Sequence, residues 1–385
     1  MKVVLFSQYL PDPCGAFFHD VAIARELQRR GHNVHFVTIN RSNKAARGVY
    51  RGIPWSHYTV SENELRGAHM WSSPHYPFLQ QVRKINEGFE KPIVVTMHFG
   101  ENLESIVEYQ RHGKWAEFLW IVSKHITSVT KSRITISPTF KTVETVRPIM
   151  LENEIKMHER GTVPSGEYIT LINANAMKGI GLFIECAVKF PHKKFLGVKP
   201  YYNGLPVPTT IPNIKWIDIQ DDIRNVLKDT RILLVPSLYE SWGRVAFEAM
   251  YNGIPVLHTK PLGKDSKYPP RPSGSTEGMC EWIQDSQFML DYGNLESWFD
   301  AIESLDNPDT YKEFSSRAYE TTYNMNVFED IKTIERKFYE YGVQFAPKDE
   351  SMKKNTAEAP TSSVPGIPSR GNAMPFRGGR FVVRR

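Results

Sequence analysis

The sequence predicts an α/β protein made of two doubly wound, parallel-sheet (Rossmann-like) domains that face a cleft, and three observations support this. The first 40 residues alternate a buried strand at 2–6, a helix that ends at Gly31, and a second strand at 32–39. A new strand–helix series begins near residue 168. Residues 147–166, between the two series, are polar and contain breakers, as interdomain linkers do. Such alternation predicts parallel strands with right-handed crossovers and a ligand at their carboxyl ends.

Apolar runs predict the remaining elements. In the first domain we expect strands at 92–98 and 133–137, with a long helix over 114–131 between them. The second domain has four expected strands, 168–174, 193–198, 214–219 and 231–237, and two expected helices, 178–190 and 221–229. We place the domains at residues 1–160, 161–327 and 328–345 (a closing helix).

Length and composition indicate a globular chain of 385 residues, 41% hydrophobic, without a membrane span. No window approaches the roughly 18 apolar residues that a spanning helix needs. The first apolar run, Val3–Phe6, is too short for a signal peptide. Three distant cysteines, Cys14, Cys186 and Cys280, favour neither a disulfide framework nor a zinc site. A cytoplasmic location is therefore expected, with peripheral membrane association left open.

The net charge of +6 is concentrated at the C-terminus. Residues 346–385 hold eight basic and three acidic residues, which leaves the other 345 residues close to neutral. The segment is rich in Pro, Ser and Gly and is predicted to be disordered. Its end, "RGNAMPFRGGRFVVRR", mixes Arg, Gly and Phe as nucleic-acid-binding tails do. A nucleic acid, an anionic membrane, an acidic polymer or no partner at all remain open.

The run "PSLYESWGRVAFEAMYNGIPVL" (236–257) carries the main functional signal. A strand ends at Val235, and Glu240–Gly243 occupy the loop before a helix, whose free backbone N–H groups suit phosphate or sugar oxygens. Gly243 gives a ligand room to approach the backbone, and Glu248 lies further along the helix. Two glutamates alone would more often be solvated acids that flank a helix, but their neighbours favour a ligand site.

This run resembles the signature of retaining GT-B glycosyltransferases of the family 4 (group 1) type. Four further segments are similar to the family, and together they extend the resemblance over roughly residues 1–345: "PDPCGAFFHDVAIARELQRRGHNVHFVT", "KPIVVTMHFG", "ISPTFK" and "NAMKGIGLFIECA". The resemblance implies a sugar nucleotide, such as a uridine diphosphate sugar, as donor and an unknown acceptor. It makes residues 1–160 the acceptor-side domain and residues 161–327 the nucleotide-sugar-binding domain.

The resemblance also implies roles for individual residues. Gly15 would let the first loop approach the donor phosphates, and His98 would lie beside the transferred sugar. Lys178 would bind the diphosphate, Glu240 the sugar, and Glu248 the ribose. The backbone amides of Ser241, Trp242 and Gly243 would help to hold the sugar.

Two departures from the family pattern concern the donor site. Asn173 stands where the family usually has an Arg, so that one diphosphate-binding cation is missing or comes from another residue such as Lys199 or Arg244. The connection over 259–282 is longer and richer in proline than usual, which implies an unusual donor or acceptor pocket.

The implied reaction retains the anomeric configuration and needs neither a metal nor a cofactor. Two other functions stay open: transfer of sugar to modified DNA bases in a viral setting, and nucleotide-sugar binding without catalysis, for which Asn173 is the only support. An aromatic and basic stripe could also face lipid, although such stripes are more often core packing: Trp115, Phe118, Leu119, Trp120, Val122 and Lys124.

Overall fold

The computed structural model describes residues 1–12, 14–40, 45–74, 79–100, 114–133, 140–200, 207–264 and 266–345. The predicted tail, 346–385, lies outside these residues, as do most of the strand expected at 133–137 and the "ISPT" part of the third family segment. Both sheets described below belong to one compact unit, Met1–Pro347.

In the first half, the described residues form an eight-stranded sheet in the order β3-β4-β2-β1-β5-β6-β7-β8. Neighbouring strands are parallel, except that β3 pairs antiparallel with β4. The strands are β1 (Lys2–Ser7), β2 (Asn33–Thr38), β3 (Arg47–Tyr50), β4 (Ile53–His57), β5 (Met70–Pro74), β6 (Ile93–Met97), β7 (Glu117–Ile121) and β8 (Phe140–Thr145). The helices are α1 (Gly15–Arg29), α2 (Glu62–Gly67), α3 (Leu79–Asn86) and α5 (Lys124–Lys131), with a 3₁₀ turn, η1 (Tyr58–Val60).

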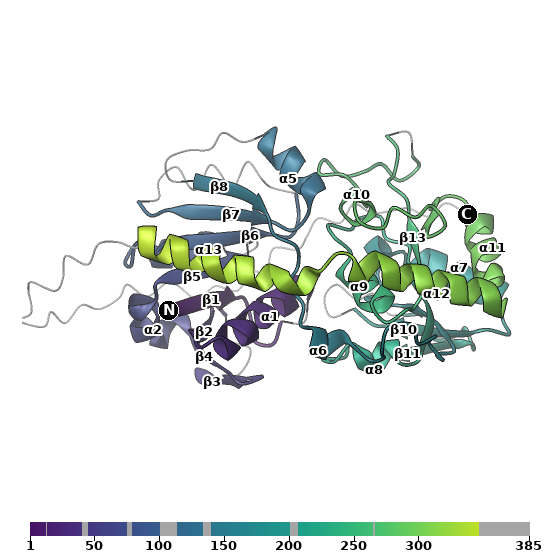
Figure 1. Cartoon of the computed structure of the whole chain (residues 1–385), viewed down its shortest axis with the longest axis horizontal. Helices are drawn as coiled ribbons and strands as arrows, with labels where there is room; N and C mark the ends of the chain where they lie inside the picture. The colour runs from purple at the N-terminus through teal and green to yellow at the C-terminus, as the bar shows by residue number, and fades with distance from the viewer. Residues whose placement is uncertain are drawn as a thin grey trace, which may run out of the picture. The chain divides into compact units, whose positions relative to one another are not determined.

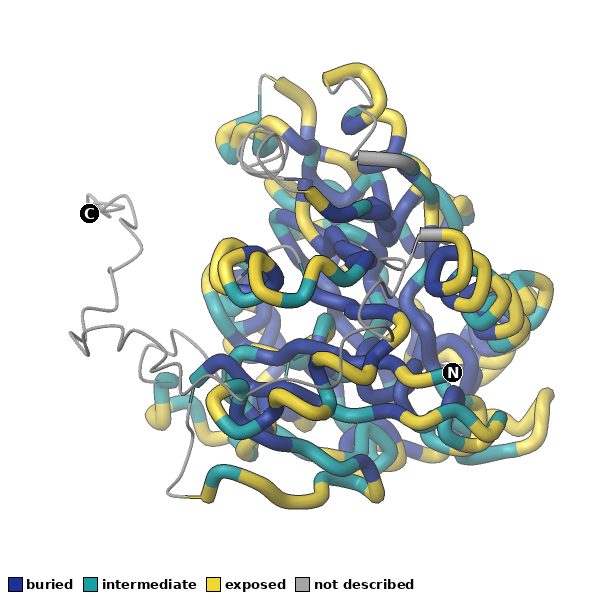
Figure 2. Tube along the Cα trace, turned by 90° about the vertical axis from the view of Figure 1, so that its left-hand side faces the viewer, coloured by how far each residue is buried: buried dark blue, intermediate teal, exposed yellow. Residues whose placement is uncertain are grey.

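Strand β1 shows why this sheet is buried on both faces. Successive side chains of a strand point to opposite faces, so that Val3 and Leu5 enter the core shared with α1. Val4 and Phe6 enter a second core on the other face. A strand covered on both sides has a continuous apolar sequence, as "VVLF" has. Figure 2 shows the buried strands in the interior and the exposed outer turns of the helices.

The long helix predicted over residues 114–131 is wrong. Residues 117–121 form β7, whose five residues are all buried between β6 and β8, and only the following α5 is helical. "EFLWI" is apolar on both faces of the sheet after its first residue, so its periodicity does not distinguish a buried strand from a buried helix. The aromatic stripe belongs to the core: Trp115, Phe118, Leu119, Trp120 and Val122 are buried, and only Lys124 is exposed. These side chains do not form a lipid-binding face.

In the second half, the described residues form a six-stranded parallel sheet in the order β11-β10-β9-β12-β13-β14. The strands are β9 (Tyr168–Leu171), β10 (Lys194–Val198), β11 (Ile214–Ile217), β12 (Thr230–Val235), β13 (Val256–Thr259) and β14 (Met289–Leu290). The helices are α7 (Ile180–Lys189), α8 (Arg224–Leu227), α9 (Arg244–Met250), α10 (Glu277–Cys280), α11 (Leu295–Ser304) and α12 (Pro308–Tyr323), with a 3₁₀ turn, η2 (Ala176–Lys178). The predicted fold class, two doubly wound parallel-sheet domains, is confirmed.

The chain reverses direction across each sheet at a central strand. In the second half it runs outward from β9 through β10 to β11, and then returns to β12 on the other side of β9. In the first half the same reversal falls between β1 and β5. Loops diverge at such switch points and leave a crevice at the carboxyl ends of the strands, where ligands bind in doubly wound folds.

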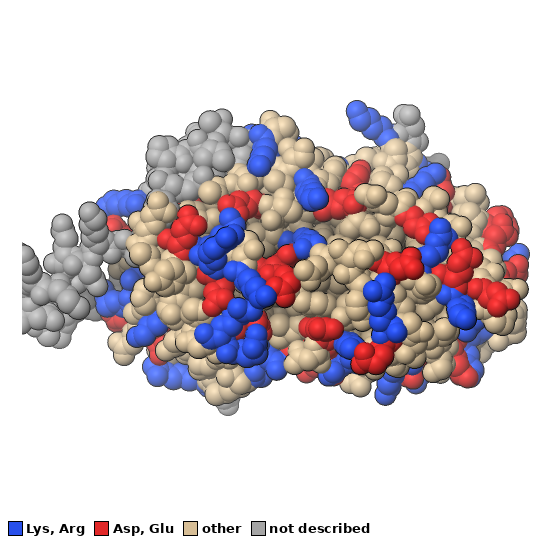
Figure 3. Space-filling view, viewed as in Figure 1, with Lys and Arg blue, Asp and Glu red and all other residues tan. Residues whose placement is uncertain are grey.

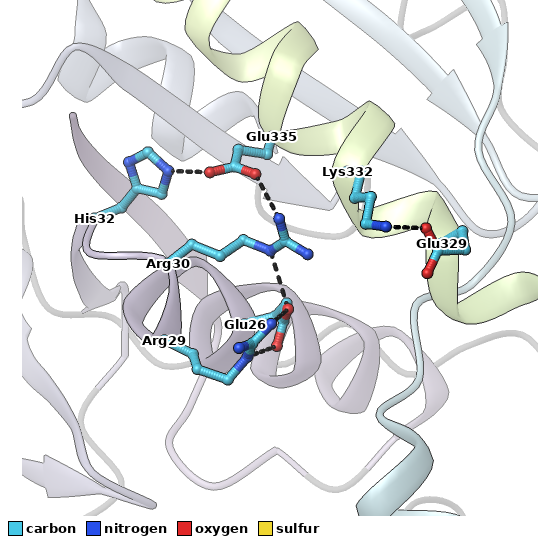
Figure 4. Close-up of polar contacts among 7 residues, drawn as sticks. All are labelled: Glu26, Arg29, Arg30, His32, Glu329, Lys332 and Glu335. Atoms are coloured by element: carbon cyan, nitrogen blue, oxygen red, sulfur yellow. Dashed lines mark hydrogen bonds and ion pairs between the residues drawn. The ribbon is translucent and has the colours of Figure 1, made fainter.

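The last helix, α13 (Asp330–Phe345), follows η3 (Val327–Glu329) and returns to the first sheet, along which it lies in Figure 1. Its apolar face joins the core of α1, and the ring of Tyr341 stacks on Phe118 with centroids 3.8 Å apart. Glu335 accepts hydrogen bonds from Arg30 at 3.0 Å and from His32 at 2.6 Å (Figure 4). Helix α13 therefore closes the first half, although it follows the second half in sequence.

The segment between the two sheets is not a simple polar linker. It contains the short helix α6 (Glu152–Ile155), and Ile149, Met150 and Ile155 are buried in the cores of both halves.

On the surface, Lys and Arg alternate with Asp and Glu over the face that Figure 3 shows. No helix among the described residues is long and apolar enough to cross a membrane.

Candidate active site

The predicted site residues of the second half lie on the loops that follow two adjacent strands, β9 and β12. Leu238 N donates a hydrogen bond to Met177 O at 2.9 Å, which joins the two loops directly. Gly179 adopts φ +78°, and a Cβ there would lie 2.0 Å from Pro236 O, so only glycine allows this approach. The "Lys-Gly" and "Pro-Ser" elements thus fit together at the switch point of the sheet.

This contact brings Lys178 and Glu240 together as an ion pair. Glu240 is only 7% exposed, and its Oε1 also accepts a hydrogen bond from Ser237 Oγ at 2.7 Å. The backbone of Glu240 is fixed as well, because its N–H donates to Ser275 O at 2.8 Å. A buried carboxylate with a cation and a hydroxyl as partners is held in one orientation.

The Ser241–Gly243 loop is packed tightly against α10. Gly243 adopts φ +79°, and a Cβ would lie 2.5 Å from Met279 Sδ. A Cβ on Gly278 would lie 1.9 Å from Ser241 O. The indole of Trp242 is only 1% exposed and stacks on Trp282 with centroids 5.2 Å apart. The ring of Trp242 therefore belongs to the core, and only its backbone is available for the predicted donor contact.

Glu248 has a cation of its own. Its Oε1 accepts a hydrogen bond from Arg244 Nε at 2.7 Å, one turn earlier on α9, and the carboxylate is only 4% exposed. Arg244 in turn lies over the ring of Phe18 in α1, with 5.9 Å between its Cζ and the ring centroid. The first residue of α9 thus contacts the first half of the chain.

Asn173 is exposed just beyond β9, and its backbone lies in the left-handed region at φ +64°. Asparagine tolerates this conformation better than most residues. Its Oδ1 accepts a hydrogen bond from Asn175 Nδ2 at 3.0 Å. Lys199, one of the two cations named as replacements for the missing Arg, pairs with the exposed Asp218 at 3.0 Å.

In the first half, His98 follows the end of β6 and is 8% exposed. Its ring meets that of His19 edge-on, with centroids 5.2 Å apart. His19 Nδ1 accepts a hydrogen bond from Ile149 N at 2.8 Å. Burial and the charge of Arg244 lower the pKa of His19 to about 3, so this imidazole is neutral at physiological pH. Gly15 begins α1, and a Cβ there would meet nothing within 4 Å.

Two carboxyl groups near the start of α1 are absent from the sequence-based prediction. Asp12 and Asp20 are buried, and Oδ1 of each has no hydrogen-bond partner among the described atoms. Burial raises the pKa of Asp12 to about 6 and that of Asp20 well above its usual range. Their position could have marked them as candidates, since both acids flank the predicted glycine loop. The sequence alone, however, does not distinguish a buried acid from a solvated one.

Three segments of the second half contact the first half: the β12–α9 loop, the β13–α10 connection and the end of α10. Gly100 N donates a hydrogen bond to Tyr239 OH at 3.3 Å, and a Cβ on Gly100 would lie 2.4 Å from the Cβ of Ser273. His125 N donates to the carboxylate of Glu281 at 2.9 Å. The strand ends of both sheets, with the predicted residues of both halves, therefore border one region.

Comparison with known proteins agrees with the resemblance to group 1 glycosyltransferases. Residues 210–265, which include Glu240 and Glu248, match the family model described as "Glycosyl transferases group 1". Lys178 and His98 lie outside the matched segment. No match was found among curated proteins.

Solved structures resemble the chain over most of its length. Sucrose-phosphate synthase from Thermosynechococcus elongatus is 12% identical, with a TM-score of 0.66 over 89% of this chain and 99% of that one. Anabaena HepE, in complex with UDP-glucose, is 14% identical, with a TM-score of 0.66 over 90% of this chain and 100% of that one. WaaG, a glycosyltransferase involved in lipopolysaccharide biosynthesis, is 13% identical, with a TM-score of 0.61 over 87% and 99%. The fold is that of GT-B glycosyltransferases, and the chain carries a group 1 segment within it.

Proposed function

We propose that this protein transfers a sugar from a nucleoside diphosphate sugar to an acceptor, with retention of the anomeric configuration. The observation that carries the proposal is the Lys178–Glu240 ion pair, held at the switch point between β9 and β12. A ligand between these loops would meet a cation, a fixed carboxylate and backbone amides within one site. The group 1 segment and the GT-B fold agree with this chemistry.

In this proposal Lys178 binds the diphosphate and stabilises the negative charge that develops as it leaves. Glu240 and the amides of Ser241–Gly243 bind the sugar hydroxyls. Glu248 accepts hydrogen bonds from the ribose. Asn173, as an exposed polar group beside Lys178, contributes a hydrogen bond rather than a charge.

On the first half, Gly15 leaves room for the diphosphate beside the start of α1, and His98 binds the transferred sugar. The acceptor enters from this side. The bond between the anomeric carbon and the diphosphate oxygen breaks, and an acceptor oxygen forms its bond on the same face of the ring. The acceptor proton passes to the departing diphosphate. Neither a metal nor a cofactor takes part in the reaction as we propose it.

A screen for nucleotide release tests the function. The purified full-length chain is incubated with uridine, guanosine, adenosine and thymidine diphosphate sugars without acceptor, and released nucleoside diphosphate is measured. Slow hydrolysis of one donor is expected, because water replaces the acceptor. Calorimetric binding of a nucleotide sugar without hydrolysis or transfer would favour the non-catalytic alternative. If the protein neither binds nor hydrolyses any of these donors, the proposal is overturned.

Once the donor and an acceptor are known, the anomeric configuration of the product tests retention by NMR. We also propose a cytoplasmic, reducing location, for which the three free cysteines are the support.

For the acceptor, the basic tail suggests an anionic molecule. Deletion of residues 346–385 should leave donor hydrolysis unchanged and weaken salt-sensitive binding to that partner. Equal binding by both forms would leave the tail without this role.

A further inference from the structure

Two buried hydrogen-bond donors near the junction of α9 and α1 have no partner among the described atoms: Arg244 Nη1 and His19 Nε2. A buried charged donor without a partner is costly, so such a group usually marks the position of a ligand or water. One donor comes from the second half of the chain and the other from the first.

The guanidinium of Arg244 is held in place but only partly used. Its Nε donates to Glu248 at 2.7 Å, its Cζ lies over the ring of Phe18, and the side chain is 17% exposed. Guanidinium has five N–H donors in a fixed plane, and one bond from Nε leaves the Nη1 donors to bind an acceptor. A planar, permanently charged group of this kind suits phosphate oxygens.

The second donor is a neutral imidazole N–H. Because Ile149 N donates to His19 Nδ1, the proton of the neutral ring is on Nε2. Arg244 is close enough for its charge to lower the pKa of His19. The neighbouring Asp20 Oδ1 is also without a partner, and neither donor bonds an acceptor among the described atoms. A ligand with several acceptor oxygens, such as a diphosphate, would satisfy both donors.

We propose that Arg244 is the second cation that binds the donor diphosphate in this chain, with His19 Nε2–H as a neutral donor from the opposite half. This inference rests on the proposed function. It explains how the chain manages with Asn173 beside Lys178: the second charge is on α9 and reaches toward α1. The phosphate site is thereby shared by the two halves, so that bound diphosphate holds them together.

Calorimetry with nucleosides that differ only in phosphate number tests the proposal on the full chain. The probes are uridine, guanosine, adenosine and thymidine, each as diphosphate and as monophosphate. Wild-type protein should bind one diphosphate more tightly than its monophosphate. Arg244→Gln should lose roughly 10- to 100-fold in diphosphate affinity, the range for a charge-assisted hydrogen bond. Arg244→Lys should fall between the two.

Lys199→Gln is the matched control, since Lys199 belongs to the same half but pairs with Asp218, and its diphosphate affinity should equal that of wild type. The monophosphate separates a direct effect from an indirect one, because loss of Arg244 also removes the partner of Glu248. Equal losses for monophosphate and diphosphate would assign Arg244 to positioning Glu248 and overturn the proposal.

Wild-type diphosphate affinity in Arg244→Gln, or a loss in Lys199→Gln instead, would also overturn it. If wild-type protein binds none of the probes, the proposed function itself fails. Thermal unfolding of each variant identifies one that does not fold, and Arg244→Lys then provides the test.

Discussion

The two halves differ in how they pair the buried carboxylates of the candidate site. In the second half each has a cation: Glu240 pairs with Lys178, and Glu248 with Arg244. In the first half, Asp12 and Asp20 each have an oxygen without a partner, and burial raises the pKa of both. The two carboxylates of the second half are thus paired before any ligand binds, as suits the proposed donor site. The two of the first half keep an oxygen without a partner, as suits the side that an acceptor completes.

The largest expected effect comes from breaking the Lys178–Glu240 pair. Lys178→Ala should lower donor turnover by about 100- to 1,000-fold, because the leaving diphosphate loses its cation. Initial rates of nucleotide release measure this. Lys189→Ala, on the exposed side of α7, is the control and should leave the rate unchanged. Turnover of Lys178→Ala within a few-fold of wild type would contradict the assignment.

Asp12→Asn tests the unpaired carboxyl groups of the first half through its effect on the free energy of unfolding. The folded-state pKa of Asp12 lies near 6, above its usual 3.8, so the folded protein holds this proton more tightly than the unfolded chain. Stability therefore falls as the pH rises from about 4 to 6, and the full cost, about 3 kcal/mol, is present at pH 7.5. The variant removes this cost.

Denaturant unfolding should give a higher unfolding free energy for Asp12→Asn at pH 7.5 and no difference from wild type at pH 4. Glu248→Gln, which leaves Arg244 without its carboxylate, should destabilise the protein at pH 7.5 instead. Changes of the same sign in both variants would remove the contrast between the halves.

Substitutions of Glu240 and of Glu248 should have different effects on turnover and on donor affinity. Glu240→Gln should lower turnover by about 10- to 100-fold more than it lowers affinity, because Glu240 faces the reacting sugar. Glu248→Ala should mainly weaken donor binding, since the ribose is unchanged by the reaction. Steady-state kinetics and calorimetry with the nucleoside diphosphate measure both. Wild-type affinity in Glu248→Ala would exclude the ribose contact.

The smallest effect is expected for Asn173→Arg. The left-handed backbone at φ +64° costs a longer side chain about 1 kcal/mol, so the unfolding free energy should fall slightly. Diphosphate affinity should rise by only a few-fold, because Arg244 already supplies the second cation. Asn173→Gly is the control for the backbone. A gain above about tenfold would mean that the wild-type site lacks a second cation, contrary to the role proposed for Arg244.

Much of the architecture could be predicted from the sequence. Buried parallel strands are short apolar runs between turns, and helices ending at glycine are periodic, so both doubly wound halves were recognised. The prediction failed at 114–131, where "EFLWI" is apolar on both faces, and it missed the cores around Ile149 and Ile155 in the supposed linker. In both places packing against distant strands decides the conformation.

The sequence by itself determined which residues are grouped along the chain: Glu240, Gly243 and Glu248 in one run, and Lys178 before Gly179 in another. Helix spacing within the same run also lets Arg244 pair with Glu248, four residues later. Only the tertiary structure joins Lys178 to Glu240 and turns the ring of Trp242 into the core. The reason is physical: periodicity reports which faces are apolar, whereas the pairing of charges depends on loops that meet only when the sheet orders β9 beside β12.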